Sequence, residues 1–212
     1  LDIHQTEEQQ VEAIKTFWSE NGNAIIAGLV IGFSGFIGLN YYNDYKLQQE
    51  LNTSEAYQTM MEASTEEGAN FEAAGNAFIA ENDASSYAML TSIALAKEAA
   101  ENQNWEKAET YLSTAIEKSV DDGIKAIATV RLARVQLQLE KYEAALATLA
   151  PELPESFDAS VEEIKGDIYF KQGKSELART AYQAAIDGAS DSSNPALQMK
   201  LDNLAQVINL NK

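Results

Sequence analysis

The chain has 212 residues, of which 45% are hydrophobic and 23% charged, enough for one packed domain and a further segment. It carries 15 lysines and arginines against 33 aspartates and glutamates, which gives a formal net charge of -18 and a pI near 4.3. Nucleic acid is disfavoured as a partner, because most of such a surface repels a polyanion. The absence of cysteine excludes disulfides, thiolate metal sites and a cysteine nucleophile.

The first element in chain order is an uncharged run, NAIIAGLVIGFSGFIGLNYY, at residues 23–42. A helix from Ala24 to Tyr42 would be roughly 28 Å long, close to the hydrocarbon thickness of a bilayer. Aromatic residues flank this run as they do at membrane interfaces, namely Trp18, Tyr41, Tyr42 and Tyr45. The sequence therefore predicts an N-terminal segment over residues 1–22 and a single uncleaved transmembrane helix over residues 23–43.

Two other interpretations of this run stay open. A cleaved signal peptide needs a basic start and small residues at the cleavage site, but acidic residues precede this run and GLNYYNDYK follows it. A buried helix of a soluble domain usually has a polar face, and this run has none over more than four turns. Lys15 before the run and Lys46 after it balance, so charge alone does not predict the orientation in a membrane.

The same run contains glycines at spacings that suit helix packing. Gly28 and Gly32 form a G-x-x-x-G pair, and together with Gly35 and Gly38 they lower the helix surface so that another backbone can approach. We expect these four glycines to form a helix-packing face in the membrane. The alternative is that they reflect only the general frequency of glycine in membrane helices.

The soluble part contains an internal repeat. Residues 44–84 are predicted to form a charged stalk helix to Met61, a loop at STEEGAN and a second helix, which could be a degenerate hairpin. From residue 85, small residues recur 37 and then 33 positions apart, each with a small partner 12 positions upstream, in the pairs Ala96 and Ala108, Ala133 and Ala145, and Gly166 and Ala178. Paired small residues allow two helices to cross closely, so residues 85–212 are predicted to be an all-α helical-hairpin solenoid.

The third copy, GDIYFKQGKSELARTAYQAAI, resembles the tetratricopeptide repeat. Its matching residues are Gly166, Tyr169, Gly173, Ala178, Tyr182 and Ala185. The first two copies lack the turn glycine and replace the two aromatic residues, with Ala99 and Leu112 in one and Gln136 and Leu149 in the other. We expect degenerate tetratricopeptide-like repeats, covered at the C-terminal end by an amphipathic helix that follows Asn194 and Pro195.

Catalytic and metal-binding constellations are almost absent from the sequence. The only histidine is His4, so a histidine-based dyad, triad or zinc site cannot be assembled within the repeats. Adjacent carboxylates near helix starts, such as Asp121 and Asp122 or Glu162 and Glu163, are typical of helix caps and dipole partners. We therefore expect a non-enzymatic protein without a cofactor or a metal.

A repeat stack without catalytic groups usually binds partners through its concave face. In tetratricopeptide proteins the first helix of each pair lines this groove, and the resemblance places there Leu90, Ile93, Lys97, Ile127, Val130, Arg134, Glu163, Asp167, Phe170 and Lys171. The apolar positions among them would suit an amphipathic or unfolded segment, or else the stalk helix covers them. Both interpretations stay open.

The block EEQQVEAIKTFWSENGNAIIAGLVIGFSGFIGLNYYNDYK followed by degenerate repeats resembles the YfgM family, the ancillary subunits of the bacterial SecYEG translocon. The resemblance implies a single-pass inner-membrane protein with a cytoplasmic N-terminus and periplasmic repeats. It implies as partners SecYEG, the periplasmic chaperone PpiD, unfolded secretory clients and membrane lipid, in an adaptor that passes emerging proteins to periplasmic chaperones. The alternative is a structural scaffold or assembly factor of another envelope membrane complex.

Overall fold

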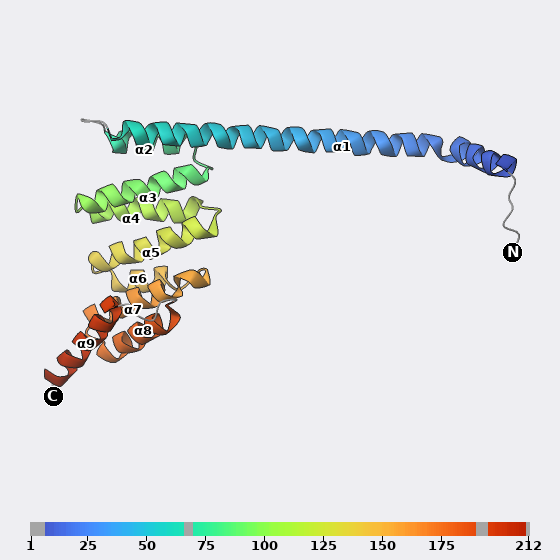
Figure 1. Cartoon of the computed structure of the whole chain (residues 1–212). Coiled ribbons are helices and arrows are strands. Elements are labelled where there is room, and N and C mark those ends of the chain that lie inside the picture. Colours follow the sequence, from blue (N-terminus) through green and yellow to red (C-terminus); the bar gives the residue numbers. More distant parts are fainter. Residues whose placement is uncertain (1–6, 66–69, 190–194, 211–212) are drawn as a thin grey trace, which may run out of the picture. The chain divides into compact units, whose positions relative to one another are not determined.

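The chain is helical almost throughout in the computed structural model, which describes residues 7–65, 70–189 and 195–210. No β-strand occurs in these residues. The chain divides into two compact units, residues 1–52 and residues 53–212, and Figure 1 shows the helices of both. The predicted all-α fold is confirmed.

The first unit is formed by the N-terminal part of α1, a helix of 57 residues from Glu7 to Ala63. It contains no proline, and the helix assignment runs from the VEAIKTFW segment into the apolar run without a gap. The large apolar side chains from Ile26 to Tyr42 are 51% to 74% exposed, which is not the environment of a buried core helix. The apolar segment of α1 is long and hydrophobic enough to cross a membrane.

The second unit stacks helices in antiparallel pairs. The three predicted hairpins are α3–α4, α5–α6 and α7–α8, and a short 3₁₀ helix, η1, precedes α7. The bounds are α2 Phe71–Glu81, α3 Ser86–Glu101, α4 Trp105–Lys118, α5 Asp122–Gln138, α6 Tyr142–Thr148, η1 Glu155–Phe157, α7 Asp158–Lys171, α8 Ser175–Gly188 and α9 Pro195–Leu210. The second unit is therefore a tetratricopeptide-like helical repeat domain.

Small residues lie where the helices of each hairpin cross. Five of the six predicted positions are alanines that are at most 3% exposed, and the sixth, Gly166, is also buried. A Cβ atom added to Gly166 would collide with the ring of Tyr182 on α8, the facing helix. The small-residue pairs identified in the sequence thus mark the closest contacts within the hairpins.

The core of the stack is divided into successive layers. Trp105 packs against the layer of α3, α4 and α5, and Tyr142 packs against the layer of α5, α6 and α7. In the last layer, Leu197 and Leu204 of α9 pack with Ala178, Tyr182 and Ala185 of α8. The apolar face of α9 thereby removes the outer face of the last hairpin from water, as a terminal repeat requires. The expected cap Asn194 lies outside the described residues.

The C-terminal end of α1 belongs to the second unit. Tyr57, Met60 and Met61 form an apolar cluster with Phe78 of α2 and Met89 of α3. This cluster explains why the two units separate after Asn52, within the segment 44–84 that the sequence analysis treats as one stalk. The helix ends at Ala63 rather than Met61, and most of the expected loop STEEGAN lies outside the described residues.

Helix α6 is half as long as its counterparts. It has 7 residues, whereas α4 and α8 each have 14. Its last helical residue is Thr148, and Pro151 and Pro154 follow, which lack the backbone N–H that a continuing helix needs. Residues 141–153, KYEAALATLAPEL, therefore form a short helix and a loop where the other two hairpins have a full-length second helix.

The turns inside the three hairpins share one backbone conformation. Gly173 has a φ of +73°, and the equivalent residues of the first two hairpins, Gln103 and Glu140, have φ angles of 58° and 59°. This left-handed region is accessible to glycine and unfavourable for residues with a Cβ atom. The turn therefore has the same conformation in the two hairpins that lack glycine. There Gln103 and Glu140 adopt a strained left-handed backbone conformation.

Replacing Glu140 by glycine should stabilise the protein. Relief of left-handed strain, about 1 to 2 kcal/mol, exceeds the extra unfolded-state entropy of glycine, so we expect a net gain of about 0.5 to 1 kcal/mol. Equilibrium urea unfolding followed by circular dichroism measures the change. As a control, Arg131→Gly, at an exposed position in the interior of α5, should destabilise by about 1 kcal/mol. An equal decrease in the free energy of unfolding in both variants would show that Glu140 is not strained.

Candidate functional site

The four predicted glycines of the apolar run have no packing role within the chain. A Cβ atom added to Gly28, Gly32, Gly35 or Gly38 would meet no atom within 4 Å beyond its own helix and chain neighbours. In contrast, Cβ atoms at Gly75 and Gly166 would press on Leu95 and Tyr182 inside the repeats. The glycines of α1 leave a low, open strip along a helix whose apolar side chains are exposed.

The predicted groove positions of the first two hairpins fall into two groups. Ile93 and Val130 are each 5% exposed and pack in the cores of their layers, so they offer little surface to a ligand. Leu90 and Ile127 are half-buried. Lys97 and Arg134 are exposed, and Lys97 pairs with Glu101 one turn further along α3. The accessible part of this surface therefore consists of the half-buried Leu90 and Ile127 and the exposed Lys97 and Arg134.

In the third hairpin, α9 occupies part of the predicted groove. The Nζ atom of Lys200 lies 2.8 Å from Glu163 Oε1 and 2.8 Å from a carboxylate oxygen of Asp167. These two predicted groove residues of α7 are therefore engaged by an internal ion pair. Phe170 and Lys171, near the C-terminal end of α7, stay exposed, Phe170 by 42%.

Tyr182 connects this ion-pair cluster to the hairpin core. Its hydroxyl donates to Asp167 Oδ1 at 2.8 Å, and the Lys200 ammonium lies 5.6 Å from the centre of its ring. Burial, together with the hydrogen bond to Asp167, raises the pKa of the Tyr182 hydroxyl above its ordinary range. Burial disfavours the charged form of Lys200, but hydrogen bonds to Asp167 and Glu163 outweigh it and raise the Lys200 pKa. This cluster holds α9 against α7 and α8.

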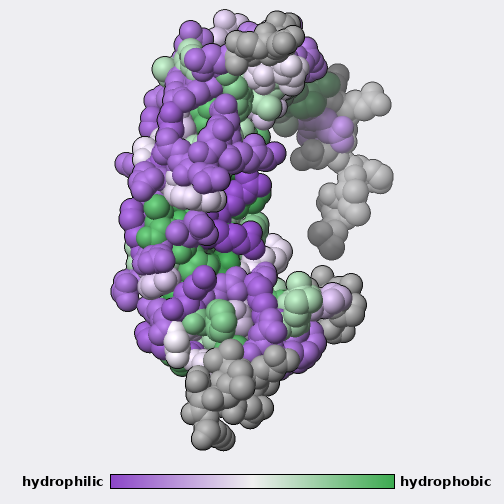
Figure 2. All heavy atoms as spheres, turned by 90° about the vertical axis from the view of Figure 1, so that its left-hand side faces the viewer, coloured by the Kyte–Doolittle hydropathy of each residue, from purple (hydrophilic) through white to green (hydrophobic). Residues whose placement is uncertain are grey.

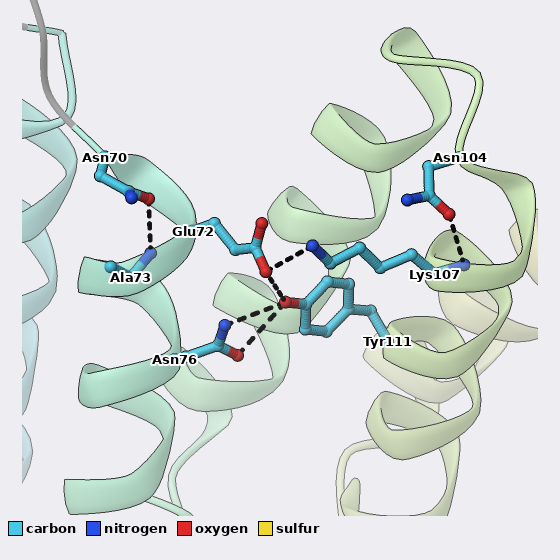
Figure 3. A network of polar contacts seen from close by, with 7 residues as sticks. All are labelled: Asn70, Glu72, Ala73, Asn76, Asn104, Lys107 and Tyr111. Carbon is cyan, nitrogen blue, oxygen red and sulfur yellow. Dashed lines mark hydrogen bonds and ion pairs between the residues drawn. The ribbon is translucent and has the colours of Figure 1, made fainter.

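A second polar cluster joins α2 to α4, as Figure 3 shows. The Nζ atom of Lys107 lies 2.5 Å from Glu72 Oε1, and the Tyr111 hydroxyl donates to the same oxygen at 3.4 Å. Asn76 donates to the Tyr111 hydroxyl at 3.0 Å. The hydrogen bond and charge of Lys107 lower the pKa of Glu72. Gly75 lies on the same helix, where its missing Cβ lets α2 approach Leu95 of α3.

The adjacent carboxylates found in the sequence have structural roles. Asp121 Oδ1 caps α5 by accepting from the backbone N–H of Ile124 at 2.8 Å. Glu162 pairs with Lys165, and Glu163 pairs with Lys200. Among the described residues, no group of three or more potential metal ligands comes together. His4 lies outside that part of the chain.

The surface of the stack is largely hydrophilic where the two helices of each hairpin are joined. Figure 2 shows this face, on which hydrophobic residues form small patches between the hydrophilic ones. Few large apolar side chains of the second unit are exposed in the described residues, and these are Val120, Phe170, Leu177 and Met199. The extended apolar surface of this chain is therefore that of α1, not that of the repeats.

Comparison with known proteins agrees with this architecture. A family model described as a tetratricopeptide repeat-like domain matches residues 15–206. The ancillary SecYEG translocon subunit of Escherichia coli (strain K12) is 34% identical over 97% of this chain and 100% of its own length. The chain belongs to the family of ancillary SecYEG translocon subunits.

Other ancillary SecYEG translocon subunits are similarly related to this chain. The subunit of Aggregatibacter actinomycetemcomitans is 34% identical over 93% of the chain and 97% of its own length. The subunit of Haemophilus influenzae (strain ATCC 51907 / DSM 11121 / KW20 / Rd) is 31% identical over the same shares. No solved structure matches the chain. The predicted YfgM-family resemblance is confirmed, and the kind of protein that the family name describes is non-catalytic.

Three residues that hold the helices of the repeat unit together, Gly75, Lys200 and Glu72, were not identified from the sequence. Gly75 lies 33 residues before Ala108, the spacing that also separates Ala145 from Ala178, and this continuation of the period was a usable signal. Lys200 and Glu72 had no comparable signal, because each pairs with a residue more than thirty positions away. Such pairings become visible only when the helices are placed in three dimensions.

The Glu72 ion pair makes a pH-dependent contribution to stability. Because Lys107 lowers the Glu72 pKa below its ordinary 4.5, the pair stabilises above that pH and its effect disappears as the pH falls through the lowered value. Glu72→Gln should therefore lower the thermal midpoint at neutral pH, with a difference from wild type that shrinks towards pH 3. Scanning calorimetry across this range measures it.

A matched control comes from an exposed pair within a single helix. Glu101→Gln removes the 3.6 Å pair of Lys97 and Glu101, which joins no two helices and should change the midpoint less. A Glu72→Gln deficit that stays constant from neutral pH to pH 3 would show that the ion pair is not its cause.

Proposed function

We propose that this chain is a non-enzymatic, membrane-anchored adaptor that associates with the SecYEG translocon and links emerging secretory proteins to periplasmic chaperones through its repeats. The proposal rests on the observation that one chain combines an exposed apolar helix with a tetratricopeptide-like stack. Relatives matched over nearly its whole length are named ancillary SecYEG translocon subunits.

A membrane anchor would raise the effective concentration of the repeats at the site where secretory proteins emerge. A binding module held at the membrane meets its ligands at an effective concentration set by its tether, so modest affinities suffice. Chaperones bound to the repeats would be retained where unfolded chains emerge. The proposed arrangement is a single pass through the bacterial inner membrane, with the N-terminus in the cytoplasm and the repeats, PpiD and clients in the periplasm.

The repeats would contact their partners through the accessible groove positions. These include two exposed cations, Lys97 and Arg134, and the exposed pair Phe170 and Lys171. Half-buried Leu90 and Ile127 add apolar area to the set. Such a surface suits a segment that carries acidic and apolar side chains, since cations on an acidic protein select partners by charge as well as by area.

The membrane contact would use the open glycine strip of α1. Without a hydrophobic driving force between helices in lipid, close backbone approach at small residues supplies the packing energy. Gly28 and Gly32 lie one helical turn apart, and a leucine at either position would hold a neighbouring helix away. We therefore place the translocon contact of α1 at these glycines and at Gly35 and Gly38.

Gly28→Leu/Gly32→Leu should weaken association with SecYEG. Native membranes are solubilised in mild detergent, the protein is recovered through a C-terminal tag, and SecY is quantified against the tagged chain. A loss of 1 to 2 kcal/mol of helix packing would lower SecY recovery about 5-fold or more. Val30→Leu/Ile37→Leu, on the opposite face of the helix, serves as the control and should keep wild-type recovery.

Two outcomes would overturn parts of this account. Wild-type recovery of SecY by the double glycine variant would remove the glycine strip as the contact. Recovery of another envelope complex by the wild-type chain, with SecY at background, would overturn the adaptor function in favour of a structural scaffold or assembly factor.

A further inference from the structure

The shortened helix α6 leaves a cleft in the repeat stack. The repeat spacing places Glu152 and Leu153 level with Ala115 and Ile116 of α4. Ala115 is fully buried, whereas Glu152 is exposed, so the chain has left the helical path at this point. About two turns of helix are missing from this layer relative to its neighbours.

The space beside the missing turns is a cleft of about 750 Å³, which we name the α6 cleft. It lies between α4, α5, α6 and the loop that replaces the end of α6, and its apolar lining includes Ile116, Leu132 and Leu153. Pro151 and Pro154 line the loop side. Because proline fixes φ, this loop loses less conformational freedom on binding than an ordinary loop. The volume is in the range of sites that enclose a small ligand or a few side chains.

The charged lining of the α6 cleft is unbalanced. Asp122, Glu152 and Glu155 line it together with one cation, Lys125, so three carboxylates oppose a single ammonium. None of these four side chains forms an ion pair within the described residues, although most lysines of the stack do. A cation that enters the cleft can therefore pair with a carboxylate without breaking an internal salt bridge.

We infer that the α6 cleft binds a polypeptide segment in which a large apolar side chain is flanked by lysine or arginine. The apolar side chain fills the space of the missing helical turns, and the cations pair with the lining carboxylates. An acidic segment is repelled, and a neutral apolar segment leaves these carboxylates partly desolvated and unpaired. The inference deepens the proposed adaptor function and rests on it for the class of partner.

Direct binding to a defined peptide tests the inference. The full-length protein is placed in phosphatidylcholine nanodiscs, with empty nanodiscs as the blank, and the probe is fluorescein-labelled Gly-Ser-Lys-Phe-Arg-Ser-Gly. We expect saturable binding by fluorescence anisotropy that weakens with added salt. Peptides with glutamate in place of both cations, or with serine in place of phenylalanine, should each bind at least about tenfold more weakly.

Matched variants locate the binding site. Ala147 is an exposed alanine that lines the cleft, and Ala147→Trp should fill the space and weaken binding at least about tenfold. Ala184→Trp makes the same change at an exposed position of α8 outside the cleft and should stay within about twofold of wild type. Circular dichroism of all variants checks that the fold is unchanged.

The charge of the cleft is tested in the same way. Glu152→Lys/Glu155→Lys should weaken binding of the cationic peptide at least about tenfold. Glu81→Lys/Glu106→Lys changes the net charge equally at exposed positions away from the cleft and should have a much smaller effect. Failure of the cationic peptide to bind, equal binding of the glutamate peptide, or unchanged binding by Ala147→Trp would each overturn the inference.

The two proposals fail separately. SecY recovered only at background together with peptide binding sensitive to Ala147→Trp would overturn the adaptor function and retain the α6 cleft as a peptide site. Normal SecY recovery without specific peptide binding would do the reverse.

Discussion

The close crossing of paired helices at small residues is the constraint on which the repeat unit depends. Ala96 and Ala108, then Ala133 and Ala145, are almost completely buried, and Gly166 has no room for a methyl group beside Tyr182. Side chains larger than these would hold the helix axes apart and loosen the layers that pack on the hairpin. Because all three hairpins share this close crossing, the first two form the same fold without the aromatic and glycine residues of the third.

Positions that depend on local or periodic rules could be predicted from the sequence. The helix pairs, the turn at Gly173 and the apolar run of α1 follow from spacing, left-handed backbone geometry and hydrophobicity. Burial of Ile93 and Val130 could not be predicted, because the packing of neighbouring layers decides which groove positions remain accessible. The engagement of Asp167 by Lys200 likewise depends on where α9 lies, which no local pattern specifies.

Residues that depart from the repeat pattern affect the structure in three different ways. Gln103 and Glu140 keep the turn and carry backbone strain, whereas Pro151 shortens a helix and changes the surface. Gln136, in place of an aromatic residue, is 7% exposed and accepts a hydrogen bond from Thr148 at 2.7 Å. A buried polar group of this kind is tolerated because it is satisfied, and it ties α5 to the short α6.

The central claim of the proposed function is that the apolar run of α1 crosses the membrane, so that the N-terminal segment and the repeats lie on opposite sides of it. Because the chain has no cysteine, single cysteines can be introduced at Thr16 before that run and at Ser113 in α4, and labelled in spheroplasts with a membrane-impermeant maleimide. The account predicts labelling of Ser113→Cys in intact spheroplasts and of Thr16→Cys only after lysis. Labelling of both before lysis, or of Thr16→Cys alone, would contradict it.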